Sequence, residues 1–117
     1  MEKRPSNLEE RTALFAEEVR RFVRQLPRTL ANIEDVKQLV RASGSVPANC
    51  IEANEALGNR DRVMRFKISR KEAKECQLWL RLVETGGRAD VEAQRIALRQ
   101  EAHELKLILT SIVRKLE

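Results

Sequence analysis

Four stretches of the chain place apolar residues three and four positions apart, the spacing of one face of an α-helix. Pro27, Gly58-Asn59 and Gly86-Gly87 separate these stretches, and such residues favour helix ends and turns. No stretch alternates apolar and polar residues as a strand does. Short turns between long helices predict an all-α fold, an antiparallel up-down-up-down four-helix bundle. The predicted helices cover about residues 8–25, 29–57, 61–84 and 89–116.

Side chains suited to capping precede two of these helices. Ser6 or Asn7 can cap the first helix, and Asn59 or Asp61 can cap the third, because their oxygens accept hydrogen bonds from free backbone amides.

The second predicted helix contains two residues that weaken helices, Gly44 and Pro47. Pro47 removes the backbone hydrogen bond to Ser43, which costs about 3 kcal/mol in a helix interior. The apolar spacing nevertheless resumes beyond Pro47 with the same period. This predicts one long helix with a local kink; the alternative is two shorter helices with a turn at 43–46. The small residues around Gly44 predict that another backbone comes close.

A set of polar residues follows on roughly one face of the same helix. Buried polar groups need partners, so we expect a structural polar cluster whose members bond to one another, to Arg41, or to basic groups of the third helix such as Arg70. The members are Asn49, Glu52 and Glu55.

The third predicted helix carries a basic stripe. At 100° per residue, six cations fall within an arc of about 100°: Arg60, Lys67, Arg70, Lys71, Lys74 and Arg81. Apolar residues flank the stripe on both sides. A bundle core needs only one apolar face, so the second flank predicts contact with a partner subunit. One flank holds Met64, Ile68, Trp79 and Leu82, and the other holds Phe66, Ala73, Cys76, Leu80 and Val83.

Length and charge narrow the class of protein. The 117 residues form one domain, residues 1–117, long enough to bury a core without metals or disulfides. The net charge is +5, and residues 59–85 alone carry eight Lys/Arg against four Asp/Glu, or +4. A local excess of this kind favours an acidic partner such as a nucleic acid backbone. The alternative is a solvated helix face that binds nothing.

Candidate chemistry is sparse. No phosphate-binding glycine loop occurs. The single histidine, His103, has Gln100 where a di-iron bundle needs glutamate. No residue pairs Cys50 or Cys76 with a catalytic base, so we expect no catalytic residue, metal, cofactor or small-molecule substrate. The spacing of the two cysteines is typical of buried thiols in a reducing cytoplasm. No apolar run reaches the roughly 20 residues of a membrane span.

The run ANIEDVKQLVRASGSVPANCIEANEAL, followed by RFKISRKEAKECQLWLRL, resembles the four-helix-bundle proteins encoded within intervening sequences of bacterial 23S ribosomal RNA genes. The first helix, LEERTALFAEEVRRFVRQLP, shares the resemblance. It implies assembly as a ring, with a homopentamer suspected, and it brings no catalytic residues. The accessory variability proteins of diversity-generating retroelements are related basic pentamers that bind RNA and a reverse transcriptase, so the resemblance also implies RNA binding by analogy.

Two functional hypotheses follow. In the first, a non-enzymatic homo-oligomer binds structured RNA or a ribonucleoprotein. Without interleaved aromatic residues, the stripe would contact phosphates and read no bases. The expected phosphate contacts are Arg60, Arg62, Lys67, Arg70, Lys71 and Lys74, while Arg65 would serve a subunit contact. In the alternative, the oligomer is a protein-interaction scaffold without nucleic-acid binding. The cations would then form intersubunit salt bridges with Glu52, Glu55, Glu72 and Glu75.

Overall fold

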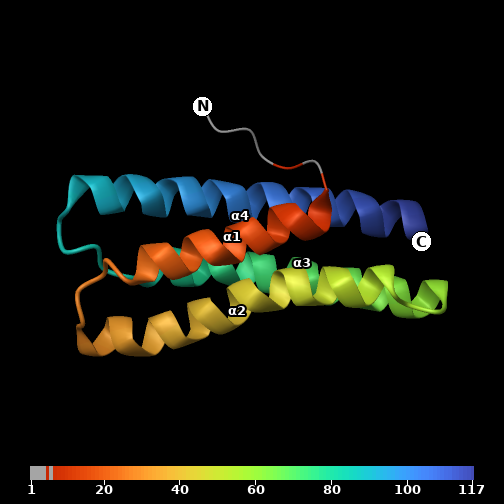
Figure 1. Ribbon diagram of the computed structural model, residues 1–117, viewed down its shortest axis with the longest axis horizontal. Coiled ribbons are helices and arrows are strands. Elements are labelled where there is room, and N and C mark those ends of the chain that lie inside the picture. Colours follow the sequence, from red (N-terminus) through yellow and green to blue (C-terminus); the bar gives the residue numbers. More distant parts are fainter. Residues whose placement is uncertain (1–4, 6) are drawn as a thin grey trace.

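A computed structural model describes residue 5 and residues 7–117, and the candidate cap Ser6 lies outside this part. The described chain contains four helices and no strand, which confirms the predicted fold class. Successive helices run in opposite directions (Figure 1). The helices are α1 (Leu8–Val23), α2 (Leu30–Asn54), α3 (Asn59–Leu82) and α4 (Ala89–Leu116).

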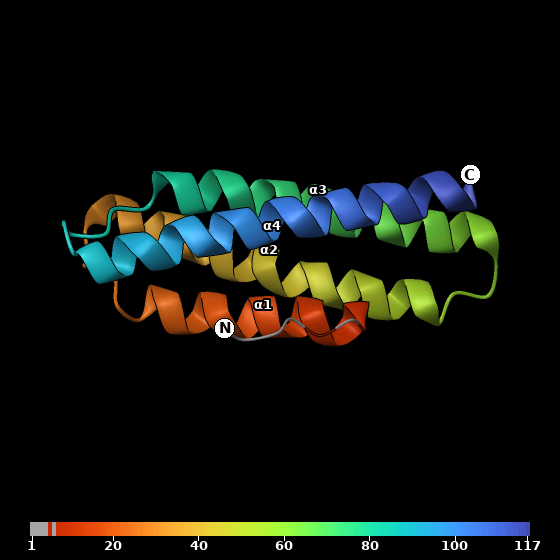
Figure 2. The same cartoon turned by 90° about the horizontal axis from the view of Figure 1, so that it is seen from above.

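The helices are arranged so that each contacts its two neighbours in the chain order, and α1 closes the bundle against α4. In the diagonal pairs, α1 with α3 and α2 with α4, no Cα atoms of the described residues come within 8 Å of each other. Figure 2 shows α1 and α3 on opposite sides of the molecule. The outer face of α3 and the outer face of α1 therefore point in different directions.

Two groups of buried side chains form the core. The larger draws on all four helices and includes Phe15, Leu39, Leu80 and Leu105. The smaller is built from α2, α3 and α4, with Leu8 of α1 packed at its side. Its buried members are Cys50, Ala53, Phe66, Leu109 and Val113.

The helix α1 is the shortest, with 16 residues against 28 in α4. At 1.5 Å per residue it spans about 24 Å, and α4 spans about 42 Å. Figure 1 accordingly shows α4 and the α2–α3 turn extending beyond the first residues of α1. One end of the bundle is thus built from three helices.

Pro47 lies inside a continuous helix α2, which confirms one helix in place of two. The kink at Pro47 stays a prediction. The helix ends at Asn54, three residues before the predicted end, because the backbone of Glu55 leaves helical angles at φ −95° and ψ 2°. Leu57 therefore lies in the turn and is fully exposed.

Side-chain caps match the prediction at one helix only. The Asn7 side chain accepts a hydrogen bond from the Glu10 amide and caps α1 as predicted. The predicted caps of α3 are wrong, because the helix begins directly after Gly58 and includes both Asn59 and Asp61. The side-chain Nδ2 of Asn59 instead donates to the carbonyl oxygen of Leu116, 2.9 Å away, and so connects the start of α3 to the end of α4.

The predicted close approach of a backbone at Gly44 is wrong. A Cβ atom at this position would meet the guanidinium Nη2 of Arg20 at 3.2 Å and no neighbouring backbone atom within 4 Å. Arg20 lies here because its Nη1 donates to the Ala16 carbonyl, 3.0 Å away, and to Ser43 Oγ, 3.4 Å away. Gly44 therefore leaves room for the Arg20 side chain of α1.

Trp79 is half-buried against the main core, and its Nε1 is buried without a hydrogen-bond partner in the described structure. We expect Trp79→Ala to lower the free energy of unfolding by about 3 kcal/mol, since a large ring leaves the core. Trp79→Phe keeps most of the packing and removes an unpaired N–H, so the change should stay below about 1 kcal/mol. Urea denaturation of both variants checks this. An equal loss in both would show that the indole N–H forms a bond that matters.

Candidate nucleic-acid interface

The basic stripe lies on the outer face of α3, because the opposite face of the helix enters the core through Phe66, Ala73, Cys76 and Leu80. Five of its six cations have no side-chain ion pair or hydrogen bond to another residue of the described chain. Four of these are exposed and Arg70 is half-buried. The exposed ones are Arg60, Lys71, Lys74 and Arg81. Their charges are free to meet an external anion.

The other two predicted phosphate contacts have partners within the chain. Lys67 Nζ lies 3.0 Å from a carboxylate oxygen of Glu117, and both side chains are about half exposed, so this pair is weak. Arg62 points toward the end of α2, where its Nε donates to the carbonyl of Ala53 at 3.3 Å and its Nη2 to that of Ala56 at 3.5 Å. Arg62 therefore closes a helix end and does not extend the stripe.

The carboxylates nearest the stripe in sequence pair with α2. Arg41 Nη1 lies 3.2 Å from Glu72 Oε2, and Arg41 Nη2 lies 3.3 Å from Glu75 Oε1. The hydrogen bond that Arg41 donates to Glu72, together with the negative charge of Glu72, raises the pKa of the Arg41 guanidinium. Glu72 is buried and Glu75 is half-buried, so these acids join two helices of one chain and do not pair with the cations of the stripe.

Of the predicted polar cluster, only Asn49 bonds to a basic group of the third helix, and the three members do not bond to one another in the described structure. Asn49 donates to the Ser45 carbonyl, 2.9 Å away, and its Oδ1 accepts from Arg65 Nη1 at 3.5 Å. Glu52 and Glu55 are exposed, and neither forms an ion pair with the described cations of α3. Arg65, predicted to serve a subunit contact, is directed to Asn49 of its own chain.

The two apolar flanks of the stripe have different surroundings. The flank with Phe66 and Leu80 is buried in the core. On the other flank, Met64 is 54 % exposed and Leu82 is 48 % exposed, while Trp79 is half-buried. The second apolar face predicted from the sequence is therefore present and not covered by this chain.

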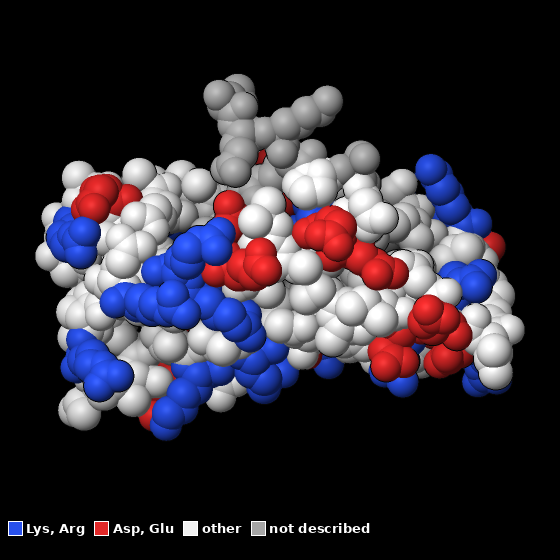
Figure 3. Space-filling view, viewed as in Figure 1, with Lys and Arg blue, Asp and Glu red and all other residues white. Residues whose placement is uncertain are grey.

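A second group of cations was not singled out in the sequence, although the run RRFVRQLPR carries it. Figure 3 views the molecule from the side of α1 and α2 and shows Lys and Arg gathered over the end where α1 stops and α2 begins. Arg21, Arg24 and Arg28 are exposed there, and none has a carboxylate partner among residues 7–117. Four arginines within nine positions were the signal that could have revealed this group.

The remaining candidate chemistry gives no site. Within the described residues, no three His, Cys, Asp or Glu side chains could hold a metal ion. Both cysteines are free and buried, and burial raises the pKa of the Cys76 thiol to about 12, so it stays a neutral thiol and a poor nucleophile near pH 7. His103 is half-buried on the surface of α4. No helix in this part of the chain is long and apolar enough to cross a membrane.

Comparisons with known proteins agree with this architecture. A solved structure from Bacteroides thetaiotaomicron, described as a protein of unknown function from the S23 ribosomal protein family, is 25% identical. The match covers 92% of this chain and 98% of that chain, with a TM-score of 0.79. The search of curated proteins finds no match. The profile of a family described as 23S rRNA-intervening sequence protein matches residues 7–111, nearly the whole chain. The chain therefore belongs to the 23S rRNA-intervening sequence protein family.

Proposed function

We propose that this protein is a homo-oligomer that binds structured RNA or a ribonucleoprotein through phosphate contacts on the outer face of α3. The observation that supports the proposal most directly is the set of free cations there. Arg60, Lys71 and Lys74 are exposed, and Arg70 is half-buried, without any carboxylate of the described chain to neutralise them. Such a surface attracts phosphates, with an affinity that falls as salt rises. Lys67 could join them, since its pair with Glu117 is exposed.

The resemblance to the accessory variability proteins of diversity-generating retroelements supports RNA as the anion and a ring of five as the assembly, by analogy. The names of the matching family and of its solved relative both refer to ribosomal components. No enzymatic activity is part of either name, and the proposal needs none. Two buried free thiols suit a reducing cytoplasm.

A protein-interaction scaffold is the second candidate. The exposed side chains of Met64, Leu78 and Leu82 lie beside or within the stripe, and clustered apolar surface marks protein contacts. One argument for the scaffold was that Glu72 and Glu75 form salt bridges between subunits. That argument is weakened, because both residues pair with Arg41 inside the chain.

Charge reversal on the stripe tests the first proposal. We expect the triple variant Arg60→Glu, Lys71→Glu, Lys74→Glu to bind a 23S ribosomal RNA stem-loop at least about tenfold more weakly. Fluorescence anisotropy over a range of salt concentrations measures this. The slope of log affinity against log salt should fall in magnitude by about 2 to 3, since three phosphate contacts are lost.

A matched control separates local contacts from net charge. The triple variant Arg99→Glu, Arg114→Glu, Lys115→Glu makes the same charge change at exposed positions of α4. It should bind nearly as the parent protein does. Equal losses in both variants would mean that only overall charge matters. Absence of binding by the parent protein at low salt would favour the scaffold.

A further inference from the structure

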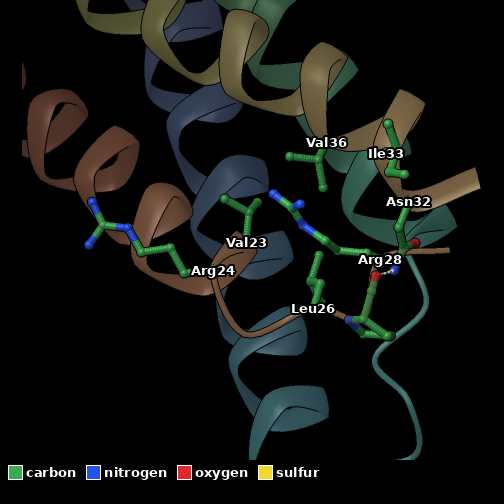
Figure 4. A pocket seen from close by; sticks show the side chains of 8 residues that line it. Val23, Arg24, Leu26, Arg28, Asn32, Ile33 and Val36 are labelled. Atoms are coloured by element: carbon green, nitrogen blue, oxygen red, sulfur yellow. Dashed lines mark hydrogen bonds between the residues drawn. The ribbon is translucent and has the colours of Figure 1, made fainter. Parts of the chain in front are cut away.

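A groove of about 500 Å³ lies between the end of α1 and the start of α2. Its floor is aliphatic, formed mainly by Val23, Leu26 and Val36 (Figure 4). Arg24 lies on the α1 side with its guanidinium directed away from the groove, and Arg28 extends over the groove toward the valines. The groove thus combines an aliphatic floor with one cation over it and a second at its rim.

The described chain neither pairs the charges at this groove nor covers its apolar side chains. Arg24 and Arg28 are exposed and have no carboxylate partner in the described structure. Ile33, on the groove wall, is 43 % exposed, and Leu30 beside it is 88 % exposed. The floor has no aromatic ring on which a nucleic-acid base could stack. An occupant with aliphatic side chains and carboxylates fits this surface best.

A segment of matching chemistry lies at the other end of the same molecule. In residues 51–57, Ile51 is 48 % exposed and Leu57 is fully exposed. Glu52 and Glu55 stand between them, exposed and without a cation partner in the described part of the chain. On the face in Figure 3, Lys and Arg gather toward one end of α1 and α2, and Asp and Glu toward the middle and the other end.

We propose that the groove receives the segment Ile51–Leu57 of a second copy of this chain. The aliphatic side chains of the segment cover the groove floor, and Glu52 and Glu55 pair with Arg24 and Arg28, which turn outward to meet them. A chain cannot fill its own groove, because groove and segment lie at opposite ends of a molecule 46 Å long. The inference rests on the homo-oligomer of the proposed function and assigns one of its interfaces.

The contact joins two different surfaces, so it is heterologous. Each copy offers one groove and one segment, and repetition closes a ring when the rotation between copies allows it. Such a ring can have an odd number of members. The outer face of α3 takes no part in the contact, which leaves its cations available.

Sedimentation equilibrium of five proteins tests the interface. Arg24→Glu with Arg28→Glu reverses the groove, and Glu52→Arg with Glu55→Arg reverses the segment. Each double variant should associate on the order of tenfold more weakly than the parent, because like charges then face each other. The quadruple variant restores opposite charges and should recover the parent mass. Leu57→Ser, at a position outside the core, should also weaken association.

The outcomes distinguish a failure of this interface from a failure of the proposed homo-oligomer. An oligomeric parent whose mass is unchanged in both double variants and in Leu57→Ser overturns this interface and leaves the proposed oligomer intact. A parent that is monomeric throughout overturns both. Weak association in the double variants without recovery in the quadruple variant also overturns the pairing, provided that circular dichroism shows all variants folded. An acidic peptide from another protein as occupant would appear as a monomeric parent.

Discussion

Arg11→Met should lower the free energy of unfolding by about 3 kcal/mol near neutral pH, because a buried carboxylate loses two charge-assisted hydrogen bonds. Arg11 of α1 donates two hydrogen bonds of 2.9 Å to Glu101 of α4, from Nε and from Nη2. The Glu101 side chain is only 4% exposed. These bonds and the charge of Glu101 raise the pKa of the Arg11 guanidinium, so Arg11 stays positively charged.

A double variant identifies the cause of this loss. The double variant Arg11→Met, Glu101→Met should recover most of the stability, since an apolar pair can replace a buried ion pair. Urea denaturation of both variants measures the loss and the recovery. The exposed pair of Arg88 and Asp90 supplies the control, and Arg88→Met should change stability little. A small loss in Arg11→Met would mean that its two hydrogen bonds to Glu101 contribute little to stability.

Asn32→Leu should cost about 3 kcal/mol, because one buried side chain holds two turns together. The Asn32 amide Nδ2 donates to the carbonyls of Pro27 and Glu84, both at 2.9 Å, and its Oδ1 accepts from the Glu84 amide at 2.9 Å. Asn32 is 1% exposed. Leucine leaves all three backbone groups without this partner, in the α1–α2 turn and in the α3–α4 turn.

Thermal unfolding of Asn32→Leu should show a melting temperature lower by roughly 10–15 °C. The matched control is Asn54→Leu, which replaces an exposed asparagine at the end of α2 and should cause a far smaller change. A similar loss in both variants would argue that leucine in α2, and not the lost turn contacts, causes the effect.

These two contacts mark what the sequence could not predict. The helix number, the Asn7 cap and the continuity of α2 past Pro47 all follow from neighbouring residues, which act within one or two turns. Arg11 and Glu101 are 90 positions apart. Each looks like a solvated helix charge until the packing of α1 on α4 is known.

The same limit applies to the interface on α3. The outward direction of the stripe followed from helical spacing, and the structure agrees for Arg60, Lys71 and Lys74. The direction of Arg62 could not be predicted in this way, because its partners are backbone carbonyls that are available only where α2 ends. Asn32 was likewise hidden in an apolar stripe, because its partners come from two turns that meet only in the folded bundle.

The short helix α1 divides the molecule into regions of unequal local stability. At one end, four helices surround the core and Asn32 ties the turns. At the other, the smaller group of buried residues is enclosed by three helices. Amides of α2 and α3 near Ala53 and Phe66 should therefore exchange hydrogen with solvent sooner than those near Leu39 and Leu80, which native-state exchange measured by NMR would show. If the segment Ile51–Leu57 docks on another copy, assembly should slow hydrogen exchange most at this less stable end of the molecule.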